Sequence, residues 1–225
     1  MTPSPPAPSL SSLAELATDL VIEGRRAILG VAGAPGAGKT TFVEALIEQV
    51  ARTHGRDWVA HLPMDGFHLA DAQLQRIGAL SRKGAPDTFD GYGYAHLLER
   101  VHCHPDEDIY APGFERTLEQ PLAASLLISP SAQLVITEGN YLLLDHEPWT
   151  RARAQLDQVW YVTANHEVRV SRLIARHMRF GKKPDDATAW VHSSDESNAR
   201  LVLETADLAD RVVVNSTSGW LTPES

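Results

Sequence analysis

The octapeptide "GAPGAGKT" at residues 33–40 is the stretch whose residue types and spacing specify a chemistry most narrowly. It fits the pattern G-x-x-x-x-G-K-[ST] in full, after an apolar run and before a helical spacing, which is the context that the pattern requires. Its glycines let backbone N–H groups approach phosphate oxygens, and the N-terminus of the next helix adds unpaired N–H groups. We therefore predict a site for ATP and Mg²⁺ formed by Gly33, Gly36, Ala37, Gly38, Lys39, Thr40 and Thr41.

Two side chains of this loop have separate tasks. Lys39 supplies a mobile positive charge for the β- and γ-phosphates, and the Thr40 hydroxyl is placed to ligate Mg²⁺. The simpler interpretation, a glycine-rich turn that binds nothing, does not account for the lysine and threonine at these positions.

Two acids follow apolar runs at the points where strands should end. Glu138 and Asp65 are placed to line the crevice at the carboxyl ends of a parallel sheet. We expect Glu138 to hold Mg²⁺ directly or through water. We expect Asp65 to accept the proton of an acceptor hydroxyl and to share the Mg²⁺ shell, with Phe67 and His68 shaping the acceptor pocket. The alternatives are a solvated acid for Glu138 and a turn-forming acid for Asp65.

A basic row lies near the C-terminal end of the chain. Four arginines fall within an arc of roughly 80° on a helix, whereas four apolar residues occupy a different face that we expect to pack. The arginines are Arg169, Arg172, Arg176 and Arg179, and the apolar residues are Val170, Leu173, Ile174 and Met178. We predict a lid around 166–183 that closes on the phosphates, and a solvated basic face is the alternative.

The elements that must position these residues alternate along the chain. Strands are predicted at 27–32, 57–64, 132–139, 158–163 and 210–215, and helices at 10–21, 42–50, 149–156, 166–180 and 185–208. Strands alternating with helices predict an α/β fold with a parallel sheet wrapped by helices on both faces. We predict a five-stranded parallel sheet in the order 2-3-1-4-5, which is a P-loop NTPase fold.

One domain should account for almost the whole chain. Residues 1–9 contain four prolines and are interpreted as a flexible tail, and 10–220 as a single domain. Glycines and prolines break the pattern between 70 and 125, and we predict there an insertion that covers the substrate. At 225 residues the chain has room for one full core.

Charge and cysteine content exclude several classes of protein. The net charge of −9 argues against a nucleic-acid or anionic-membrane binder, and one cysteine, Cys103, excludes an internal disulfide framework. No apolar run approaches the roughly 18 residues that a membrane span requires. These features predict a cytoplasmic protein with a small-molecule partner. The sequence does not fix the oligomeric state, and a homodimer stays open.

Several stretches in the same order resemble one group of kinases. The phosphate loop, "MDGFHL", "RKGAPDTFD", "YAPGFER", "ITEGNYLLLD" and "RLIARHMRFGK" together resemble the uridine kinase, pantothenate kinase and phosphoribulokinase group of P-loop kinases. The similarity spans about residues 27–215. Within the group, the chain looks most similar to a bacterial branch called nucleoside/nucleotide kinase-like or fructose-transport-system kinase.

The resemblance implies further roles for single residues. It implies that Arg172 and Arg176 are the lid arginines and that Asp65 is the catalytic base. It also implies that Asp90 holds the ribose hydroxyls of an acceptor and that Arg116 lies near a basic residue on the substrate side. Where uridine kinases carry D-S-F-Y, this chain has D-G-F-H, and the pyrimidine-contacting histidine has no clear match.

These observations predict an ATP-dependent phosphotransferase acting on a small-molecule hydroxyl, with a nucleoside as the first candidate acceptor. A sugar (fructose) or pantothenate kinase is the alternative of the same class, and a non-catalytic ATP-binding regulator is the alternative of another. A GTPase is excluded because neither D-x-x-G after a strand nor N-K-x-D occurs.

Overall fold

The computed structural model describes residues 9–216 and 219–222. The predicted tail at 1–9 therefore lies, apart from Ser9, outside the described residues. Ser9 caps the first helix, because its hydroxyl accepts a hydrogen bond from the backbone N–H of Ser12. None of the helices in the described ranges is long and apolar enough to cross a bilayer.

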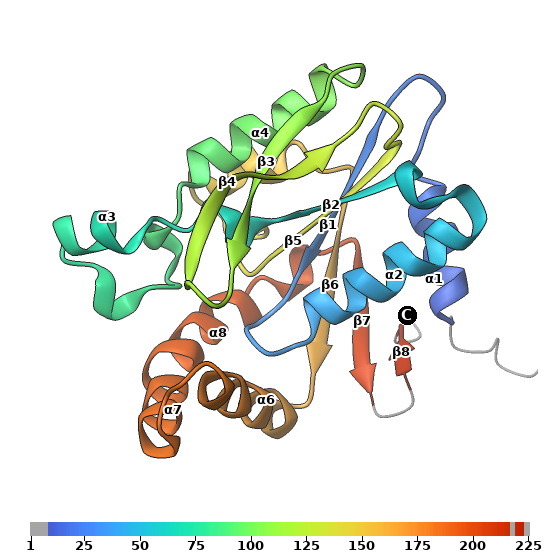
Figure 1. Ribbon diagram of the computed structural model, residues 1–225. Coiled ribbons are helices and arrows are strands. Elements are labelled where there is room, and N and C mark those ends of the chain that lie inside the picture. The colour runs from blue at the N-terminus through green and yellow to red at the C-terminus, as the bar shows by residue number, and fades with distance from the viewer. Residues whose placement is uncertain (1–8, 217–218, 223–225) are drawn as a thin grey trace, which may run out of the picture.

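The central sheet has its strands in the order β2-β5-β1-β6-β7-β8 (Figure 1). The first five are parallel, and in chain order they are the second, third, first, fourth and fifth parallel strands, so the predicted order 2-3-1-4-5 is confirmed. Their bounds are Val59–Pro63 (β2), Leu134–Gly139 (β5), Ala27–Ala32 (β1), Gln158–Ala164 (β6) and Arg211–Ser216 (β7).

The predicted number of five strands needs a correction. A sixth strand, β8 (Gly219–Leu221), pairs antiparallel with β7 at the edge of the sheet. Three residues are too few to show the alternation by which a strand is recognised in a sequence.

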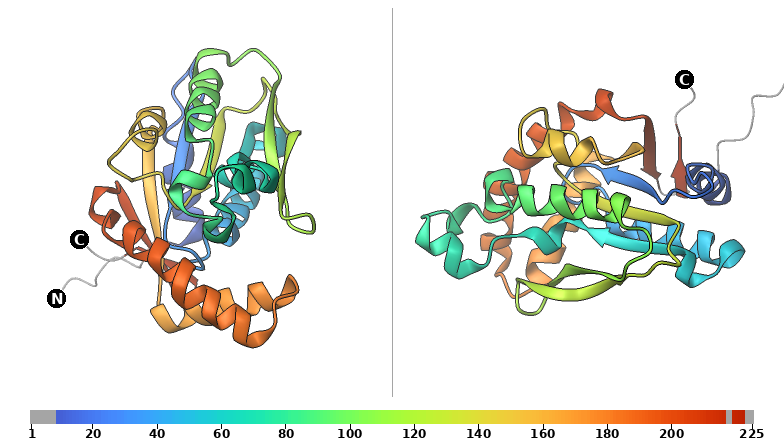
Figure 2. Two further views of the ribbon diagram at one scale, coloured as in Figure 1. Left: turned by 90° about the vertical axis from the view of Figure 1, so that its left-hand side faces the viewer. Right: turned by 90° about the horizontal axis from the view of Figure 1, so that it is seen from above.

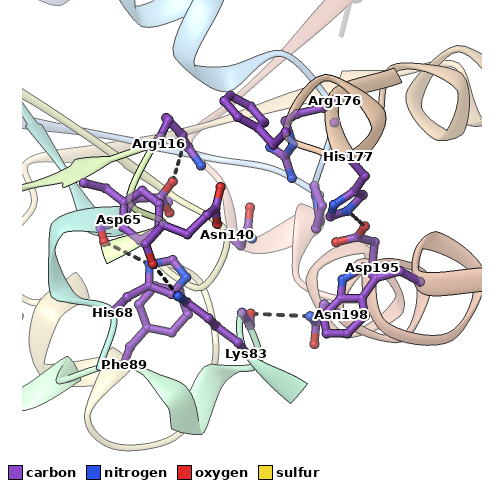
Figure 3. Close-up of a pocket in the computed structure, with 18 of the residues that line it drawn as sticks. Asp65, His68, Lys83, Phe89, Arg116, Asn140, Arg176, His177, Asp195 and Asn198 are labelled. Carbon is purple, nitrogen blue, oxygen red and sulfur yellow. Dashed lines mark hydrogen bonds and ion pairs between the residues drawn. The ribbon is translucent and has the colours of Figure 1, made fainter. Parts of the chain in front are cut away.

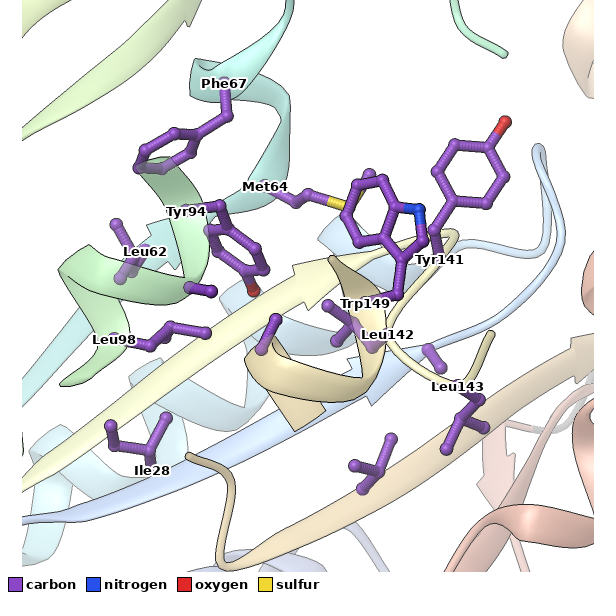
Figure 4. Close-up of a cluster of buried hydrophobic side chains, with 14 of the residues drawn as sticks. Ile28, Leu62, Met64, Phe67, Tyr94, Leu98, Tyr141, Leu142, Leu143 and Trp149 are labelled. Atoms are coloured by element: carbon purple, nitrogen blue, oxygen red, sulfur yellow. The ribbon is translucent and has the colours of Figure 1, made fainter. Parts of the chain in front are cut away.

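Helices cover both faces of the sheet, as predicted (Figure 2). Side chains of β1 that point to one face pack with α1 (Leu10–Thr18) and α2 (Lys39–His54). Those pointing to the other face pack with α4 (Gly91–Cys103), α5 (Trp149–Arg153) and α8 (Glu196–Leu203). This second cluster includes the large side chains of Tyr94, Tyr141 and Trp149 (Figure 4). Burial on both faces explains why the central strands are continuous apolar runs.

The segment 70–125 is more regular than its sequence predicts. It holds the short helix α3 (Asp71–Arg76), the 13-residue helix α4 and an antiparallel hairpin of β3 (Ile109–Glu115) and β4 (Gln120–Ile128). Glycines 91 and 93 conceal the start of α4, where Asp90 caps the helix by accepting a hydrogen bond from the N–H of Gly93. Most of β4 is solvent-exposed, so it lacks the buried apolar face that marks a strand.

The C-terminal helical region is an arm formed by three helices. It comprises α6 (His166–Arg179), α7 (Pro184–Trp190) and α8, and a π-helical turn, Val191–Asp195, joins the last two. The predicted helix at 185–208 thus changes its winding in the middle and ends at residue 203. We call residues 166–203 the α6–α8 arm; α6 and α7 project from one end of the sheet (Figures 1 and 2).

A close contact between two backbones holds the end of β2 in place. Residues Met64–Phe67 form a short 3-10 helix after β2. A Cβ on Gly66 would lie 2.1 Å from the carbonyl oxygen of Pro112 in β3. Only glycine allows this turn, and the Asp65 side chain beside it, to lie so close to the hairpin.

We expect Gly66→Ala to destabilise the protein by about 2 kcal/mol or more, because the added methyl group would overpack a backbone contact that cannot move cheaply. Gly24→Ala is the matched control: Gly24 has a φ of +79° with no neighbouring atom near an added Cβ, so it should cost only the strain of about 1 kcal/mol. Urea unfolding of both variants measures the difference. Equal losses would show that the contact with Pro112 does not constrain Gly66.

Candidate active site

The phosphate loop connects β1 to α2 as predicted, and its shape depends on two glycines. Gly36 and Gly38 have φ angles of +78° and +96°, which other residues rarely adopt. Gly38 is the N-cap of α2, so the free N–H groups of that helix begin directly at the loop. Gly33 begins the loop, Ala37 is buried within it, and Thr41 lies exposed in the first turn of α2.

Lys39 is a buried cation inside this loop. Its ammonium group donates to the carbonyl oxygens of Gly33 (2.9 Å) and Ala34 (3.3 Å) and to Oδ1 of Asn140 (2.6 Å). Burial lowers the pKa of Lys39 to about 8, and the negative charges of Glu138 and Asp65 oppose that shift. The ammonium group is therefore held by neutral oxygens within the field of two carboxylates.

Thr40 and Glu138 face one another beside Lys39. The Thr40 hydroxyl donates to Oε1 of Glu138 at 2.8 Å. Glu138 is the last residue but one of β5, is 6% exposed, and has its pKa raised above the usual value by burial. The carboxyl group of Glu138 and the hydroxyl group of Thr40 can thus both supply oxygen ligands to a cation.

The donor set of these residues fits Mg²⁺. The ion prefers hard oxygen ligands and keeps several waters, so it takes only one or two protein oxygens besides phosphate oxygens. The Thr40 hydroxyl and the carboxylates of Glu138 and Asp65 provide such oxygens. Within residues 9–216 and 219–222 there is no group of three or more histidine, cysteine, aspartate or glutamate side chains that could hold a metal without such help.

Asp65 lies after β2, as predicted, and its carboxylate has a cationic partner. Arg116, which follows β3, donates to Oδ2 of Asp65 at 2.7 Å. Burial alone would raise the pKa of Asp65, but the charges of His68, Arg116, Arg176 and Lys39 outweigh it and hold the pKa below its usual value. Burial lowers the pKa of His68 as well, and the negative charge of Asp65 opposes that shift.

His68 and Arg116 are packed around one aromatic ring. The Arg116 guanidinium lies 5.0 Å from the centre of the Phe114 ring, and the His68 ring centre lies 4.9 Å from it. Lys83 lies 5.8 Å over the same ring and forms an ion pair with Asp71. The insertion and the hairpin thus supply a mixed aromatic and basic wall.

Asp65, His68, Lys83, Phe114 and Arg116 line one cavity of about 370 Å³. Figure 3 shows Asp65, Arg116 and His68 on one side of it, and Arg176, His177 and Asp195 of the α6–α8 arm on the other. Lys39, Thr40 and Asn140 also line it. The structure therefore brings seven of the residues singled out in the sequence to one cavity: Gly36, Lys39, Thr40, Asp65, His68, Arg116 and Arg176. Glu138 is not among the lining residues and reaches the site through its hydrogen bond with Thr40.

Two predicted acceptor residues lie elsewhere. Asp90 is exposed, and its carboxylate caps α4 instead of lining the cavity. Phe67 is 8% exposed and packs on Tyr94 in the hydrophobic cluster, with ring centres 5.1 Å apart. The rings that line the cavity next to His68 are those of Phe89 and Phe114.

The arginine row of α6 divides into different environments. Arg176 lines the cavity. Arg172 is exposed, and one of its terminal nitrogens would lie 3.6 Å from a Cβ built on Gly38 of the phosphate loop. Arg169 is only 3% exposed: it donates to the carbonyl oxygen of Pro35 at 2.9 Å and pairs with Glu196.

The prediction that the apolar face of α6 packs is wrong for most of that face. Leu173 is buried, but Val170, Ile174 and Met178 line a surface groove, and Met178 is 44% exposed. The buried side of α6 is instead the one with Leu173 and Arg169, because Arg169 finds hydrogen-bond partners inside the protein.

Sequence reasoning missed other residues of the site. Asn140, which holds Lys39, follows Glu138 by two positions in the predicted strand end, and only that position could have suggested it. Lys83 and His177 lie within stretches that carry the family resemblance, but neither was singled out there, and Asp195 lies outside those stretches. Polar residues at the end of the last parallel strand are candidates for the edge of an adenine pocket: the Asn215 amide donates to the carbonyl oxygen of Ala37 at 2.9 Å, and Thr217 lies outside the described residues.

Comparison with known proteins gives named relatives that cover most of this chain, whereas no family model matches it. A protein of Schizosaccharomyces pombe, provisionally named a uridine kinase, is 34% identical over 182 residues, which is 78% of this chain and 77% of that protein. An "ATP-dependent kinase-like protein" of Aspergillus versicolor is 38% identical over 145 residues, or 60% of this chain and 84% of the relative. A crystal structure from Silicibacter sp. TM1040, provisionally named a fructose transport system kinase, has 30% identity and a TM-score of 0.81, covering 91% of this chain and 98% of that one.

The pKa of Lys39 predicts how ATP binding depends on pH. A phosphate beside the ammonium group would raise the pKa of Lys39. Below about pH 8 Lys39 is already protonated in the free protein, so the affinity for ATP should not change with pH in that range. Above pH 8 binding must first protonate Lys39, and the Kd for ATP should rise by up to about tenfold per pH unit.

Calorimetric titration with ATP between pH 7 and pH 9.5 would measure this dependence. The matched control, Lys39→Met, should bind more weakly and without the rise above pH 8. A Kd for the unmodified protein that stays level over the whole range would show that Lys39 does not face the phosphates.

Proposed function

We propose, on the premise that this chain belongs to the uridine kinase, pantothenate kinase and phosphoribulokinase group of P-loop kinases, that it phosphorylates a hydroxyl group of a nucleoside. The chain is a kinase that uses ATP. What we propose beyond this is the identity of the acceptor, the need for Mg²⁺ and the roles of single residues.

One observation carries the proposal. Asp65 lines the same cavity as Lys39 and Thr40 of the phosphate loop. A carboxylate kept ionised by neighbouring cations, and placed where an acceptor would meet the terminal phosphate, suits transfer to an alcohol.

The transfer step assigns a task to each group. The acceptor oxygen attacks the γ-phosphorus while its proton passes to Asp65, and the bond from phosphorus to the β-γ bridging oxygen breaks to release ADP. Lys39 and Arg176 neutralise negative charge on the phosphates as the transition state forms. Mg²⁺, held by Thr40 and by Glu138 with Asp65 in its shell, would supply further neutralisation of the same charge.

Arg116 and Arg172 would act beside the reacting atoms. Arg116 holds Asp65 by its hydrogen bond and so orients the carboxylate toward the acceptor. Arg172, close to Gly38, would meet the nucleotide from the side of the α6–α8 arm. His68 and Phe114 would pack on the acceptor, because flat rings suit a nucleobase.

Two alternatives remain, and only the first has specific support. A sugar acceptor is favoured by the similarity to the Silicibacter protein and by Asp90, which caps α4 and so is not placed to hold ribose hydroxyls. A regulator that binds ATP without transferring phosphate is the alternative of another class. The presence of Asp65 with its cationic neighbours weighs against it, since a regulator has no need of a base.

Asp65→Asn should lower kcat by about 10²–10⁴-fold, because the amide cannot accept the proton, and should leave the Kd for ATP within a few-fold. Asp57→Asn, an exposed acid ahead of β2, is the control and should match the unmodified enzyme. Steady-state ADP release and ATP titration measure the two effects. Near-normal turnover of Asp65→Asn would remove Asp65 from the role of base.

The acceptor is tested by ADP release from Mg·ATP with uridine, cytidine, pantothenate, fructose, ribulose 5-phosphate and glycerate. We expect acceleration by uridine or cytidine over the rate with water. Acceleration by fructose or pantothenate alone would select the alternative acceptor. Intact ATP binding without acceleration by any member of the panel would favour the regulator.

A further inference from the structure

The α6–α8 arm contributes a pair of polar side chains that the transfer step does not use. Nε2 of His177, on α6, lies 2.7 Å from Oδ2 of Asp195 in the π-helical turn. Both side chains are largely buried, at 17% and 12% exposed, and both residues line the cavity. The pair lies across the cavity from Asp65 and Arg116 (Figure 3).

The winding of the arm places this pair. The π-helical turn Val191–Asp195 inserts an extra residue between α7 and α8, and such turns often occur at functional sites. Asp195 and its neighbour Glu196 both reach α6, where they pair with His177 and Arg169. Gly181, with a φ of +97°, follows the C-cap of α6. The ammonium group of the next residue, Lys182, lies 4.6 Å from the centre of the Trp190 ring.

Hydrogen bonding fixes which atom of His177 carries a proton. An ionised carboxylate can only accept, so Nε2 of His177 is the donor to Asp195. In the neutral ring Nδ1 is then an acceptor. The second oxygen of Asp195 is also an acceptor.

Asn198 adds a third acceptor by the same reasoning. Its amide group lies 3.4 Å from the carbonyl oxygen of Gly84, which can only accept, so the nitrogen must face Gly84. The amide oxygen of Asn198 remains as the acceptor. Asn198 is 7% exposed and lines the same cavity.

We propose that His177, Asp195 and Asn198 form a subsite that binds hydroxyl groups of the acceptor at a distance from the reacting one. The three side chains present acceptor atoms, so the ligand must present donors, and a diol or polyol does so. This inference rests on the proposed function. It places hydroxyl recognition on the arm, whereas Asp90 is engaged in capping α4.

A site built to hydrogen-bond a hydroxyl rejects an analogue that lacks it, because buried polar groups then stay unpaired. The subsite should therefore determine the KM of the acceptor and leave the KM of ATP unchanged. A purely structural role for the pair would change thermal stability, or both KM values, instead.

The kinetic test compares uridine with 2′,3′-dideoxyuridine, which retains the reacting 5′-hydroxyl. Asp195→Asn should raise the KM for uridine about tenfold, with the KM for ATP within twofold and with little change for the dideoxy analogue. His177→Gln keeps a donor to Asp195 but lacks Nδ1, and it should also raise the KM for uridine while its melting temperature stays near that of the unmodified protein.

His192→Asn, an exposed position in the same π-helical turn, is the control and should match the unmodified enzyme. If fructose rather than uridine is the acceptor, the same variants are compared with fructose. Equal effects on uridine and its dideoxy analogue, or an unchanged KM for the accepted substrate, would overturn the subsite.

A separate measurement does not depend on turnover. The ¹⁵N chemical shifts of His177 in the ligand-free protein should show the proton on Nε2 and the lone pair on Nδ1. A ring protonated at Nδ1 would overturn the subsite, since the wall would then offer a donor. If ATP binds but neither uridine nor fructose accelerates ADP release, the proposed acceptor class is wrong. The spectrum of His177 then tests by itself whether the subsite presents hydrogen-bond acceptors.

Discussion

The burial of the Lys39 ammonium group is the constraint on which the site depends. Removing a cation from water is costly unless oxygens replace its hydration shell, and here two loop carbonyls and Asn140 do so. The loop must keep its curled shape for those carbonyls to point inward, and Asn140 must follow β5 at a fixed distance. The nucleotide site is thus assembled before any phosphate arrives, and binding need not order it.

Arg169 extends this organisation to the other side of the cavity. Its guanidinium joins the carbonyl of Pro35 in the phosphate loop to Glu196 at the start of α8. Asp195, the residue before Glu196, holds His177. One buried arginine thus contacts both the phosphate loop and the first residue of the helix that follows Asp195.

The sequence predicts the nucleotide half of the site because that half is local. Lys39 and Thr40 belong to one loop with its own strand and helix, and the parallel strands are buried on both faces, so each is an apolar run that can be counted and ordered. Glu138 and Asp65 are found because each follows such a run. The sequence did not predict β8, because that strand has only three residues. It did not predict α4, because the first turn of that helix holds two glycines beside the capping Asp90.

The half of the cavity that we propose binds the acceptor could not be predicted in the same way, because its residues come from segments that meet only in the folded chain. Arg116 lies in the turn between β3 and β4, Lys83 lies in an irregular loop, and the position of Asp195 depends on one extra residue in a helix. Helical spacing even misassigned the packed side of α6, since it treats every arginine as a surface residue. A buried Arg169 with carbonyl and carboxylate partners reverses that rule. The residues of the phosphate loop thus stand together in the sequence, whereas the residues that we propose choose the acceptor meet only through contacts between distant segments, which can change without altering the loop.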